Sequence, residues 1–365
     1  MSKLLLLSTL LCSSPPADSV KRVNLLPIPV LYYTPETRLA YGAAATTTFR
    51  FKNDTLVALP NGRVYVPHPS QVTVGIARTQ NRQLAFYAPF QLFWKQDRYF
   101  LIGEVGYYRY NYYFFGLDDR PIEPERFGVN FPRIRLNAFR RVSRLDAPGR
   151  LFAGLRYQFE DYRVNEVEPE GVLASGTIPG GLGSRMSGLG PGLFYDTRDN
   201  LFYPSRGLIV DLKTLHHGRA LGSNVTFDRW QADVSTYHKV SNRAILAVNY
   251  VVSITTGGTA PFNGLSLLGG PKRGRGYYEG RFRDDNLALV QAELRMNVWR
   301  RFGAVAFGSL GALGDRDRLF RVNTPRESYG AGLRYRINRD LVNLRIDYGF
   351  GRQSNGFYIT IGEAF

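Results

Sequence analysis

Apolar and polar residues alternate with a period of two over most of the chain, from about residue 25 to the C-terminus. The run "LVQAELRMNVW" is the clearest case, because apolar residues alternate there with Gln291, Glu293, Arg295 and Asn297. The run "LVNLRIDYG" repeats the pattern with Asn343, Arg345 and Asp347. Successive side chains of a strand point to opposite faces, so each run predicts a strand with one apolar and one polar face. Long stretches of helical periodicity are hard to find, and the pattern predicts an all-β protein.

Turn signals between the alternating runs divide the chain into about sixteen strands of roughly ten residues. The predicted strands are 25–34, 38–51, 70–80, 83–94, 99–114, 126–144, 150–163, 187–198, 206–217, 225–238, 243–256, 286–299, 302–312, 327–337, 341–350 and 355–365. Their connections differ in length. Tight turns are expected at 95–98, 241–243, 300–301 and 338–340, and long loops at 115–125, 164–186, 257–285 and 313–326. Short turns on one side and long loops on the other are typical of outer-membrane barrels, although 52–69 is long for the short-turn side.

The make-up of the two faces indicates their surroundings. The polar face mixes arginine with Asp, Glu, Asn and Gln, whereas the water-exposed face of a soluble sandwich tends to carry Lys, Glu and Thr. The other face carries aliphatic and aromatic residues, and aromatics make up 14% of the chain. No apolar run reaches the roughly 20 residues of a membrane-spanning helix. The sequence therefore predicts a transmembrane antiparallel β-barrel with a lipid-facing exterior and a wet, ion-paired lumen.

The chain is strongly basic, with a formal net charge of +17, and only seven of its 47 basic residues are lysines. Arginine favours planar, bidentate pairing with carboxylate or phosphate. Nucleic-acid-binding proteins are also basic, but their charge usually gathers on one face, helix or tail. Here the arginines are spread along the strands. We expect them to line the lumen, with lipid phosphate as a second partner and no nucleic acid.

The N-terminal segment differs from the rest. Residues 1–20 have Lys3, a short apolar core and then small and polar residues, which is typical of a secretory signal peptide. The single cysteine, Cys12, lies in this segment, so neither a disulfide framework nor a thiol metal site is expected. Residues 21–365 are then expected to form one barrel, without a folded periplasmic module.

One loop stands out between two predicted strands. The stretch "GGPKRGRGYYEGRFRDDN", residues 269–286, places five glycines among four arginines. A phosphate cradle, a site for an anionic surface and an ion-paired plug inside the barrel all fit such a composition. The phosphate cradle fails on spacing, because "GRGYYEG" is G-x-G-x-x-x-G and no helix follows it. Glycines allow sharp turns, and arginine then presents a fixed set of donors to a carboxylate. A solvated, mobile loop is the remaining alternative.

Four motifs carry a resemblance to a known family. The stretch "RGRGYYEGRFRDDN" is similar to the Arg-Gly-Tyr/Phe loop motif of the bacterial surface antigen family, the outer-membrane insertases and translocases that include BamA and TamA. "YYTPETRLAYGA" (32–43) resembles the first hairpin of that family, and "FYDTRDNLFYPSRG" (194–207) resembles one of its turns. "FYITIGEAF" resembles its C-terminal strand, which ends in an aromatic residue, here Phe365.

The resemblance implies roles for individual residues. The loop motif comprises Gly274, Arg275, Gly276 and Tyr277. In the family this loop folds back into the lumen, where the arginine pairs with acidic groups of the barrel wall. Glu293 stands at the acidic position of the family, whereas Ser309 stands where the family usually has an inward Asp. Asp347 is the expected substitute.

The turn motif and the histidines complete the candidate residues. The periplasmic turn motif comprises Asp196, Arg198, Asp199, Pro204 and Gly207, for which we expect an ion-pair network at the rim. His216 and His217 are adjacent, so on a strand they face opposite sides and cannot chelate one ion. Asp211 or Ser205 could form a catalytic pair with His217, but no nucleophile motif such as G-x-S-x-G occurs. We expect no enzyme activity, no metal and no cofactor.

The resemblance also implies a function. The chain is expected to assist insertion or translocation of polypeptides, or of lipids, at the bacterial outer membrane through a seam between its first and last strands. Pro27 and Pro29 each remove a ladder donor from the first of these strands. The expected partners are outer-membrane lipid and lipopolysaccharide, unfolded polypeptide clients and a periplasmic partner protein. The alternative is a passive channel or structural surface barrel. The family's insertases normally recruit substrates through periplasmic POTRA domains, and residues 21–365 are expected to contain no POTRA domain.

Overall fold

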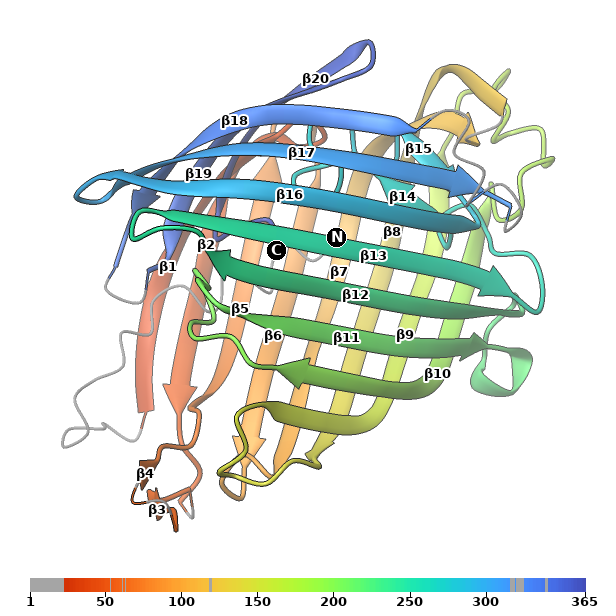
Figure 1. Ribbon diagram of the computed structural model, residues 1–365. Helices are drawn as coiled ribbons and strands as arrows, with labels where there is room; N and C mark the ends of the chain where they lie inside the picture. The colour runs from red at the N-terminus through yellow and green to blue at the C-terminus, as the bar shows by residue number, and fades with distance from the viewer. Residues whose placement is uncertain are drawn as a thin grey trace.

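In the computed structural model, sixteen antiparallel strands form a closed barrel (Figure 1). The structure describes residues 23–52, 54–60, 62, 64–117, 120–315, 319, 325–338 and 341–365. The segment predicted to be a signal peptide, 1–20, and part of the predicted loop 313–326 lie outside the described residues. All sixteen strands predicted from the alternation are present, with ends that differ by a few residues.

The barrel strands follow one another in chain order, and each pairs with its neighbours in the sequence. Their bounds are β1 Val23–Thr34, β2 Arg38–Phe49, β5 Ser70–Thr79, β6 Leu84–Trp94, β7 Tyr99–Leu117, β8 Arg120–Arg141, β9 Arg150–Glu166, β10 Gly183–Asp196, β11 Gly207–His217, β12 Phe227–Lys239, β13 Ala244–Thr256, β16 Asn286–Trp299, β17 Phe302–Gly314, β18 Arg326–Arg336, β19 Asn343–Gly351 and β20 Ser354–Ile361. This up-and-down order requires only hairpin connections.

Three small elements lie in the connections. The strands β3 (Val57–Ala58) and β4 (Val64–Tyr65) form a two-stranded sheet within the long connection 50–69. The strands β14 (Ser266–Leu268) and β15 (Phe282–Asp284) form another at the base of the arginine- and glycine-rich loop. A single 3-10 turn, η1 (Arg219–Leu221), follows β11. None of the described residues belongs to a helix that is long and apolar enough to cross a membrane.

The barrel is polar inside and apolar outside. On β16 the side chains of Glu293 and Arg295 are fully buried, whereas those of Val290 and Leu294 are 37% and 38% exposed. Exposed apolar side chains recur around the outside, among them Trp230 on β12 and Tyr329 on β18. This arrangement reverses that of a soluble protein and matches a wall whose outer face meets lipid. The prediction from alternation is therefore confirmed for strand number, antiparallel order and closure.

The seam between the first and last strands has the least pairing. β1 pairs with β2 through twelve residue pairs, and β19 pairs with β20 through eight. Between β1 and β20 the described residues form one pair, Tyr33↔Ile359. The ladder from β1 to β2 continues through Pro27 and Pro29. Among the described residues, no strand therefore pairs with most of the other edge of β1.

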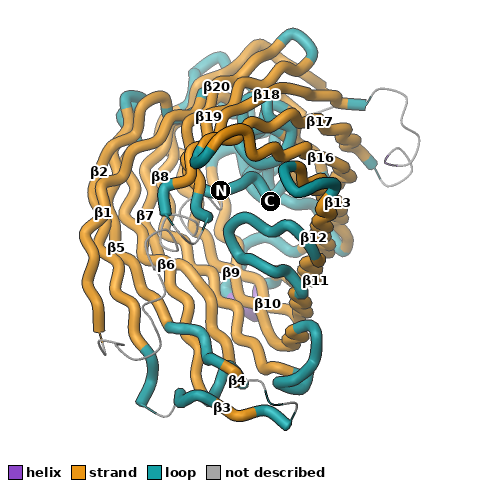
Figure 2. Tube along the Cα trace, turned by 60° about the vertical axis from the view of Figure 1, so that its left-hand side comes forward, coloured by secondary structure: helices purple, strands orange, loops and turns teal. Residues whose placement is uncertain are grey.

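Two sequence predictions were wrong in detail. The predicted loop 115–125 is mostly strand, because β7 and β8 continue as a paired hairpin to Leu117 and from Arg120, with a register shift between Phe114 and Gly116. The predicted last strand, 355–365, ends at Ile361. Gly362 then has a φ of 80° and its N–H donates to the Asn343 carbonyl, so the chain turns away from the barrel wall. In both views the C-terminal end lies within the outline of the barrel (Figures 1 and 2).

Candidate functional site: a loop ion-paired to the barrel wall

The loop between β14 and β15, here called the Arg275 loop (residues 269–281), lies against the inner side of the wall. β15 contacts both β7 and β17, which belong to different parts of the barrel. The Gly276 N–H donates to the Tyr358 hydroxyl at 3.1 Å, and Ser354 Oγ donates to the Gly276 carbonyl at 2.8 Å. The buried Tyr277 donates its hydroxyl to the Glu327 carbonyl at 2.6 Å. The tip of the loop is thereby bonded to β20 and to the β18 wall.

Two glycines allow this close approach. A Cβ on Gly349 of β19 would lie 2.8 Å from the carbonyl carbon of Arg275. A Cβ on Gly276 would lie 2.6 Å from the Phe350 carbonyl carbon, and Gly276 also has a φ of 115°. Any other residue at either position would push the two backbones apart. The glycines therefore let the loop backbone lie directly on β19.

Arg275 is the centre of the contact. Its Nη2 lies 2.6 Å from Glu293 Oε1, and its Nη1 lies 2.6 Å from Asp347 Oδ2. The guanidinium carbon lies 3.5 Å from the centroid of the Phe307 ring. One cation thus has two carboxylates in its plane and an aromatic face beneath it, a geometry that suits arginine and not lysine.

These residues belong to a larger buried ionic cluster. Its seven members have side chains no more than 3% exposed, and they are Arg275, Arg295, Arg334, Arg345, Glu293, Asp347 and Glu363. Arg295 lies 2.7 Å from Glu293, and Arg334 lies 2.6 Å from Asp347 and 2.9 Å from Glu363. Four guanidinium groups therefore share three carboxylates.

Ser309 is not part of this cluster. Its hydroxyl pairs with that of Ser328 at 2.8 Å, between β17 and β18. The second carboxylate beside Arg275 is that of Asp347, on β19. Sequence reasoning did not assign Arg295, Arg334 and Arg345 as partners, although the alternation places Arg295 and Arg345 on the same face as the two carboxylates.

The C-terminal residues contribute to the site from an unexpected position. The prediction that Phe365 ends the last strand is wrong, because this residue lies outside β20, and its carbonyl accepts from Arg295 Nη2 at 2.9 Å. The Arg295 guanidinium carbon also lies 5.5 Å from the centre of the Phe365 ring. Glu363 accepts from Asn343 Nδ2 at 2.8 Å as well as from Arg334. The residues after Gly362 therefore turn into the lumen.

The Arg275 loop also reaches the other side of the seam. The N–H of Glu279 donates to Glu36 Oε1 at 2.7 Å, and Glu36 belongs to the turn between β1 and β2. Three residues earlier, Gly276 is bonded to Tyr358 of β20. A single short segment is thus hydrogen-bonded to β20 on one side of the seam and to the turn after β1 on the other.

Space remains in the lumen beside the loop. A cavity of about 750 Å³ is lined by side chains from β7 to β16, by the loop and by the C-terminal residues. Its lining is rich in charge and includes Arg135, Arg156, Lys213, Asp211 and Asp233. Arg273 of the loop pairs across it with Asp233 at 2.9 Å. The cavity therefore carries charged groups of both signs in its lining and is bounded in part by the loop.

The turn motif after β10 forms two separate networks. Asp196 pairs with Arg198 at 3.0 Å and with Arg150 at 3.6 Å. Asp199 instead accepts from the Ser205 hydroxyl at 2.5 Å and from the Ser205 N–H at 2.8 Å. Gly207 has a φ of 98°, which ends the turn where β11 begins. Pro204, beside Ser205, is buried in this turn.

A further rim network was not predicted from the sequence. His68 Nδ1 lies 2.5 Å from Asp97 Oδ2, and the Tyr65 hydroxyl donates to the same oxygen at 2.5 Å. Burial by itself would raise the pKa of Asp97, but the hydrogen bonds and charge of His68, with the Tyr65 hydroxyl, outweigh it and hold this pKa below its usual value. Arg150 Nη1 lies 2.6 Å from His68 Nε2. The contacts of Arg150 therefore join the β3–β4 connection to the turn after β10.

The histidines on β11 do not meet in one site. His216 pairs with Asp228 at 2.6 Å and is largely exposed, whereas His217 is buried and stacked on Phe227. Asp211 is paired with Arg156, and Ser205 with Asp199, so neither lies in a catalytic pair with His217. Among the described residues no group of His, Cys, Asp and Glu side chains is arranged to hold a metal ion.

A family model for the Omp85 superfamily domain matches residues 70–365. The chain belongs to the Omp85 superfamily. The resemblance of its motifs to an outer-membrane insertase and translocase family is thereby confirmed at the level of the family. No curated protein sequence matches the chain.

Solved Omp85-type barrels share the fold. BamA from Haemophilus ducreyi lacking POTRA domains 1–3 aligns with a TM-score of 0.58 at 14% identity, over 94% of this chain and 71% of that one. CdiB from Acinetobacter baumannii aligns with a TM-score of 0.59 at 16% identity, over 94% and 60%. CdiB from Escherichia coli gives 0.60 at 12% identity, over 94% and 63%. The chain thus spans less than two thirds of each CdiB chain and somewhat more of the BamA chain.

Proposed function

We propose that this Omp85 barrel assists the insertion or translocation of polypeptides at the bacterial outer membrane, through a seam between β1 and β20. The observation that carries the proposal is the pairing at that seam, a single residue pair beside a β1–β2 ladder of twelve. An exposed strand edge is a template for another strand. An unfolded client strand would pair with the free edge of β1.

Pro27 and Pro29 support this assignment. They are two residues apart, so their nitrogen atoms lie on the same edge of β1, and neither offers an N–H. Prolines in a sheet are tolerated where an edge is unpaired. A client held at this edge would form fewer hydrogen bonds than in a regular ladder, and it could leave again.

In the proposed mechanism the Arg275 loop is an internal strut. Through Arg275 it is fixed to Glu293 and Asp347, and its polar contacts reach both strands of the seam. The loop supports the wall beside the weak seam and obstructs the lumen. Outer-membrane lipid, an unfolded polypeptide client and a periplasmic partner protein are the proposed partners, and no enzymatic step is required.

A locked seam tests the proposal. In a Cys12→Ser background, Tyr33→Cys and Ile359→Cys introduce one cysteine on each side, at positions paired at the distance of neighbouring strands. The control is Leu31→Cys with Tyr41→Cys, which joins β1 to β2, where no opening is proposed. Each protein is reconstituted into vesicles and given an unfolded barrel client. We expect oxidation to stop client insertion only with the Tyr33–Ile359 pair and a reductant to restore it; equal insertion by the locked and reduced proteins would refute the seam.

The polar lumen supports a second candidate function, a passive channel. Its cavity of about 750 Å³ is lined by charged side chains, as expected of a water-filled path. Single-channel conductance in planar bilayers separates the two functions. A steady conductance without any effect on client insertion favours the channel, whereas client insertion by a barrel of low conductance favours the insertase.

A further inference from the structure

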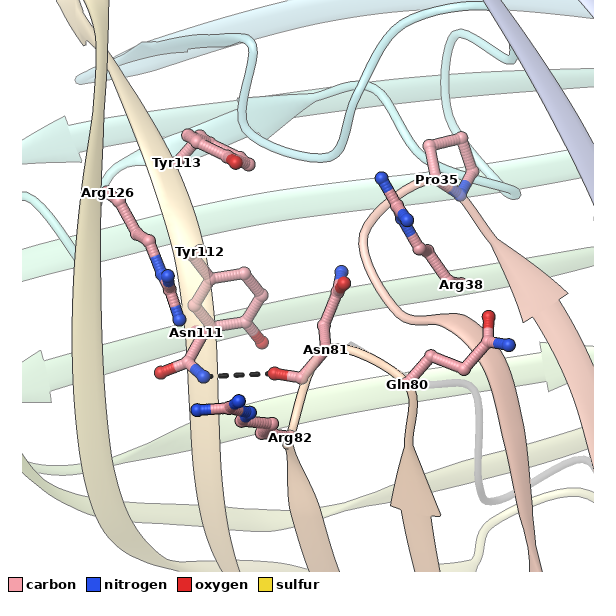
Figure 3. A pocket seen from close by; sticks show the side chains of 9 residues that line it. All are labelled: Pro35, Arg38, Gln80, Asn81, Arg82, Asn111, Tyr112, Tyr113 and Arg126. Atoms are coloured by element: carbon pink, nitrogen blue, oxygen red, sulfur yellow. Dashed lines mark hydrogen bonds between the residues drawn. The ribbon is translucent and has the colours of Figure 1, made fainter.

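A second polar pocket lies at the opposite end of the barrel from the C-terminal residues. It is formed where the β1–β2 and β5–β6 hairpins turn and where β7 and β8 extend beyond them (Figure 3). Its volume is about 390 Å³, within the range of about 300–1,000 Å³ typical of small-molecule sites. The lining residues are Pro35, Arg38, Gln80, Asn81, Arg82, Asn111, Tyr112, Tyr113 and Arg126.

The residues that line the pocket carry positive charge, and no described acidic residue is among them. Arg38, Arg82 and Arg126 all line it, and no Asp or Glu does. Within the part of the chain that the structure describes, no carboxylate lies within ion-pair distance of any of the three guanidinium groups, whereas each arginine of the cluster around Arg275 has a carboxylate beside it. Three like charges around one space repel each other. A bound anion would remove this repulsion.

Two acids close to these arginines in the sequence, Glu36 and Glu125, are engaged elsewhere. Glu125 accepts the N–H groups of Val172 and Leu173. Glu36 lies between Pro35 and Arg38, but its side chain is 1% exposed and its Oε1 accepts the N–H of Glu279 in the Arg275 loop. It does not line the pocket. Among the described residues the three guanidinium groups therefore have no carboxylate as ion-pair partner, although Glu168 Oε1 accepts the backbone N–H of Arg126 at 2.7 Å.

Hydrogen bonds between the hairpins hold the pocket in shape. Asn111 Nδ2 donates to the Asn81 carbonyl at 2.9 Å, and Asn81 Nδ2 donates to the Glu36 carbonyl at 2.8 Å. Figure 3 shows Asn81 and Asn111 between the arginines, which come from three neighbouring hairpins. A site fixed in this way loses little conformational entropy when a ligand binds.

The surface beside the pocket indicates what kind of anion would reach it. Apolar side chains on the same strands are exposed to the lipid side, with Leu39 37%, Tyr41 50% and Phe86 46% exposed. A molecule with a charged head and an apolar tail would contact both surfaces. We propose that this pocket binds a phosphate group of a lipid in the adjacent leaflet, which is the external leaflet because short turns such as 95–98 face the periplasm in barrels of this kind. The assignment is independent of insertase activity.

The test compares one lipid with and without its phosphates. Purified protein in a neutral detergent is titrated calorimetrically with diphosphorylated lipid A, with the same lipid lacking phosphate, and with inorganic phosphate. Because each arginine would contribute a charge-assisted hydrogen bond, we expect Arg38→Ala, Arg82→Ala or Arg126→Ala to weaken lipid binding about tenfold each. Lysine replacements, which keep the charge but lose the planar fork, should weaken it less.

The triple alanine variant needs a control of equal charge. Arg243, Arg300 and Arg301 are exposed at the other end of the barrel, and their triple alanine variant loses the same three charges. We expect this control to bind the phosphorylated lipid as the unmodified protein does, while the pocket variant does not. Heat-modifiable migration in gels checks that both fold. Equal losses in both variants, or equal binding of the dephosphorylated lipid, would overturn the proposal, and binding of inorganic phosphate alone would assign the pocket to a soluble anion instead.

Discussion

Arg275 and Glu293 form one buried ion pair, yet replacing one or the other should cost different amounts of stability because of the charged cluster around them. The described cluster holds four arginines and three carboxylates. Glu293→Gln leaves four arginines with two carboxylates, and it removes one of the two charged partners of Arg275 and the nearer charged partner of Arg295. Arg275→Ala instead leaves three arginines with three carboxylates, and Asp347 keeps Arg334 at 2.6 Å.

The magnitudes follow from this imbalance. Breaking a buried pair and leaving an uncompensated charge costs about 3–5 kcal/mol, so Glu293→Gln should destabilise the barrel by that amount. Arg275→Ala loses two charged hydrogen bonds but leaves a balanced remainder, and about 2–3 kcal/mol is expected. The matched control is Arg273→Ala in the same loop. Arg273 and Asp233 are each 32% exposed, so their pair should contribute no more than about 1 kcal/mol.

The assay is urea unfolding of detergent-solubilised protein, followed by tryptophan fluorescence and by heat-modifiable migration in gels. The expected order of unfolding midpoints is unmodified protein, Arg273→Ala, Arg275→Ala and then Glu293→Gln, from highest to lowest. Arg275→Ala should also expose the loop to protease, whereas Arg273→Ala should not. If Arg275→Ala and Arg273→Ala unfold at the same midpoint, or if Glu293→Gln is harmless, the ion-paired strut is refuted.

Three further changes test the same structure. Gly349→Ala adds a Cβ that would lie 2.8 Å from the Arg275 carbonyl carbon. It should therefore destabilise the barrel by about 1–3 kcal/mol in the urea assay, whereas Ala substitution of an exposed residue should not. Tyr358→Phe leaves the buried Gly276 N–H without its partner and should cost about 1–3 kcal/mol; no change would mean that water replaces the hydroxyl. The low pKa of Asp97 means that its contribution to stability is present above its ordinary pKa and lost as pH falls through the lower folded-state value. Below about pH 4 the unmodified protein should therefore lose more stability than Asp97→Asn, and parallel pH profiles would contradict the rim network.

The sequence was sufficient for the barrel because a period of two survives on every strand. Glu293 and Arg295 alternate with Leu294, and the polar pair is buried while the apolar residue is exposed. The β7–β8 extension was not predicted because its sequence does not keep this period of two. Its residues include Pro121 and Pro124, which resemble loop residues, yet Pro121 pairs with Gly116 in a hairpin beyond the barrel wall. Pairing outside the membrane does not require one apolar face.

The candidate site was only partly predictable. The motif and the alternation indicated Arg275, Glu293 and Asp347. In the structure the Arg275 guanidinium lies 2.6 Å from each of the two carboxylates. The role of Glu363 depends on the turn at Gly362, and a strand pattern continued to the last residue conceals that turn. The contact of Glu279 with Glu36 joins residues far apart in the sequence. Such contacts are set by closure of the barrel and by strand register, which a local pattern does not contain.

The bridge from Gly276 to Tyr358 and from Glu279 to Glu36 has a mechanical consequence. Separation of the first hairpin from the last strand would stretch three residues of backbone, and one of the two hydrogen bonds would have to break. The ion pairs of Arg275 and the hydroxyl of Tyr277 also hold the loop to β16, β18 and β19, so parting of the seam has to work against these contacts as well. Opening of the seam and displacement of the loop from the lumen would then be one coupled movement. A client too short to pull the loop free could widen the seam only at the end nearer the C-terminal residues.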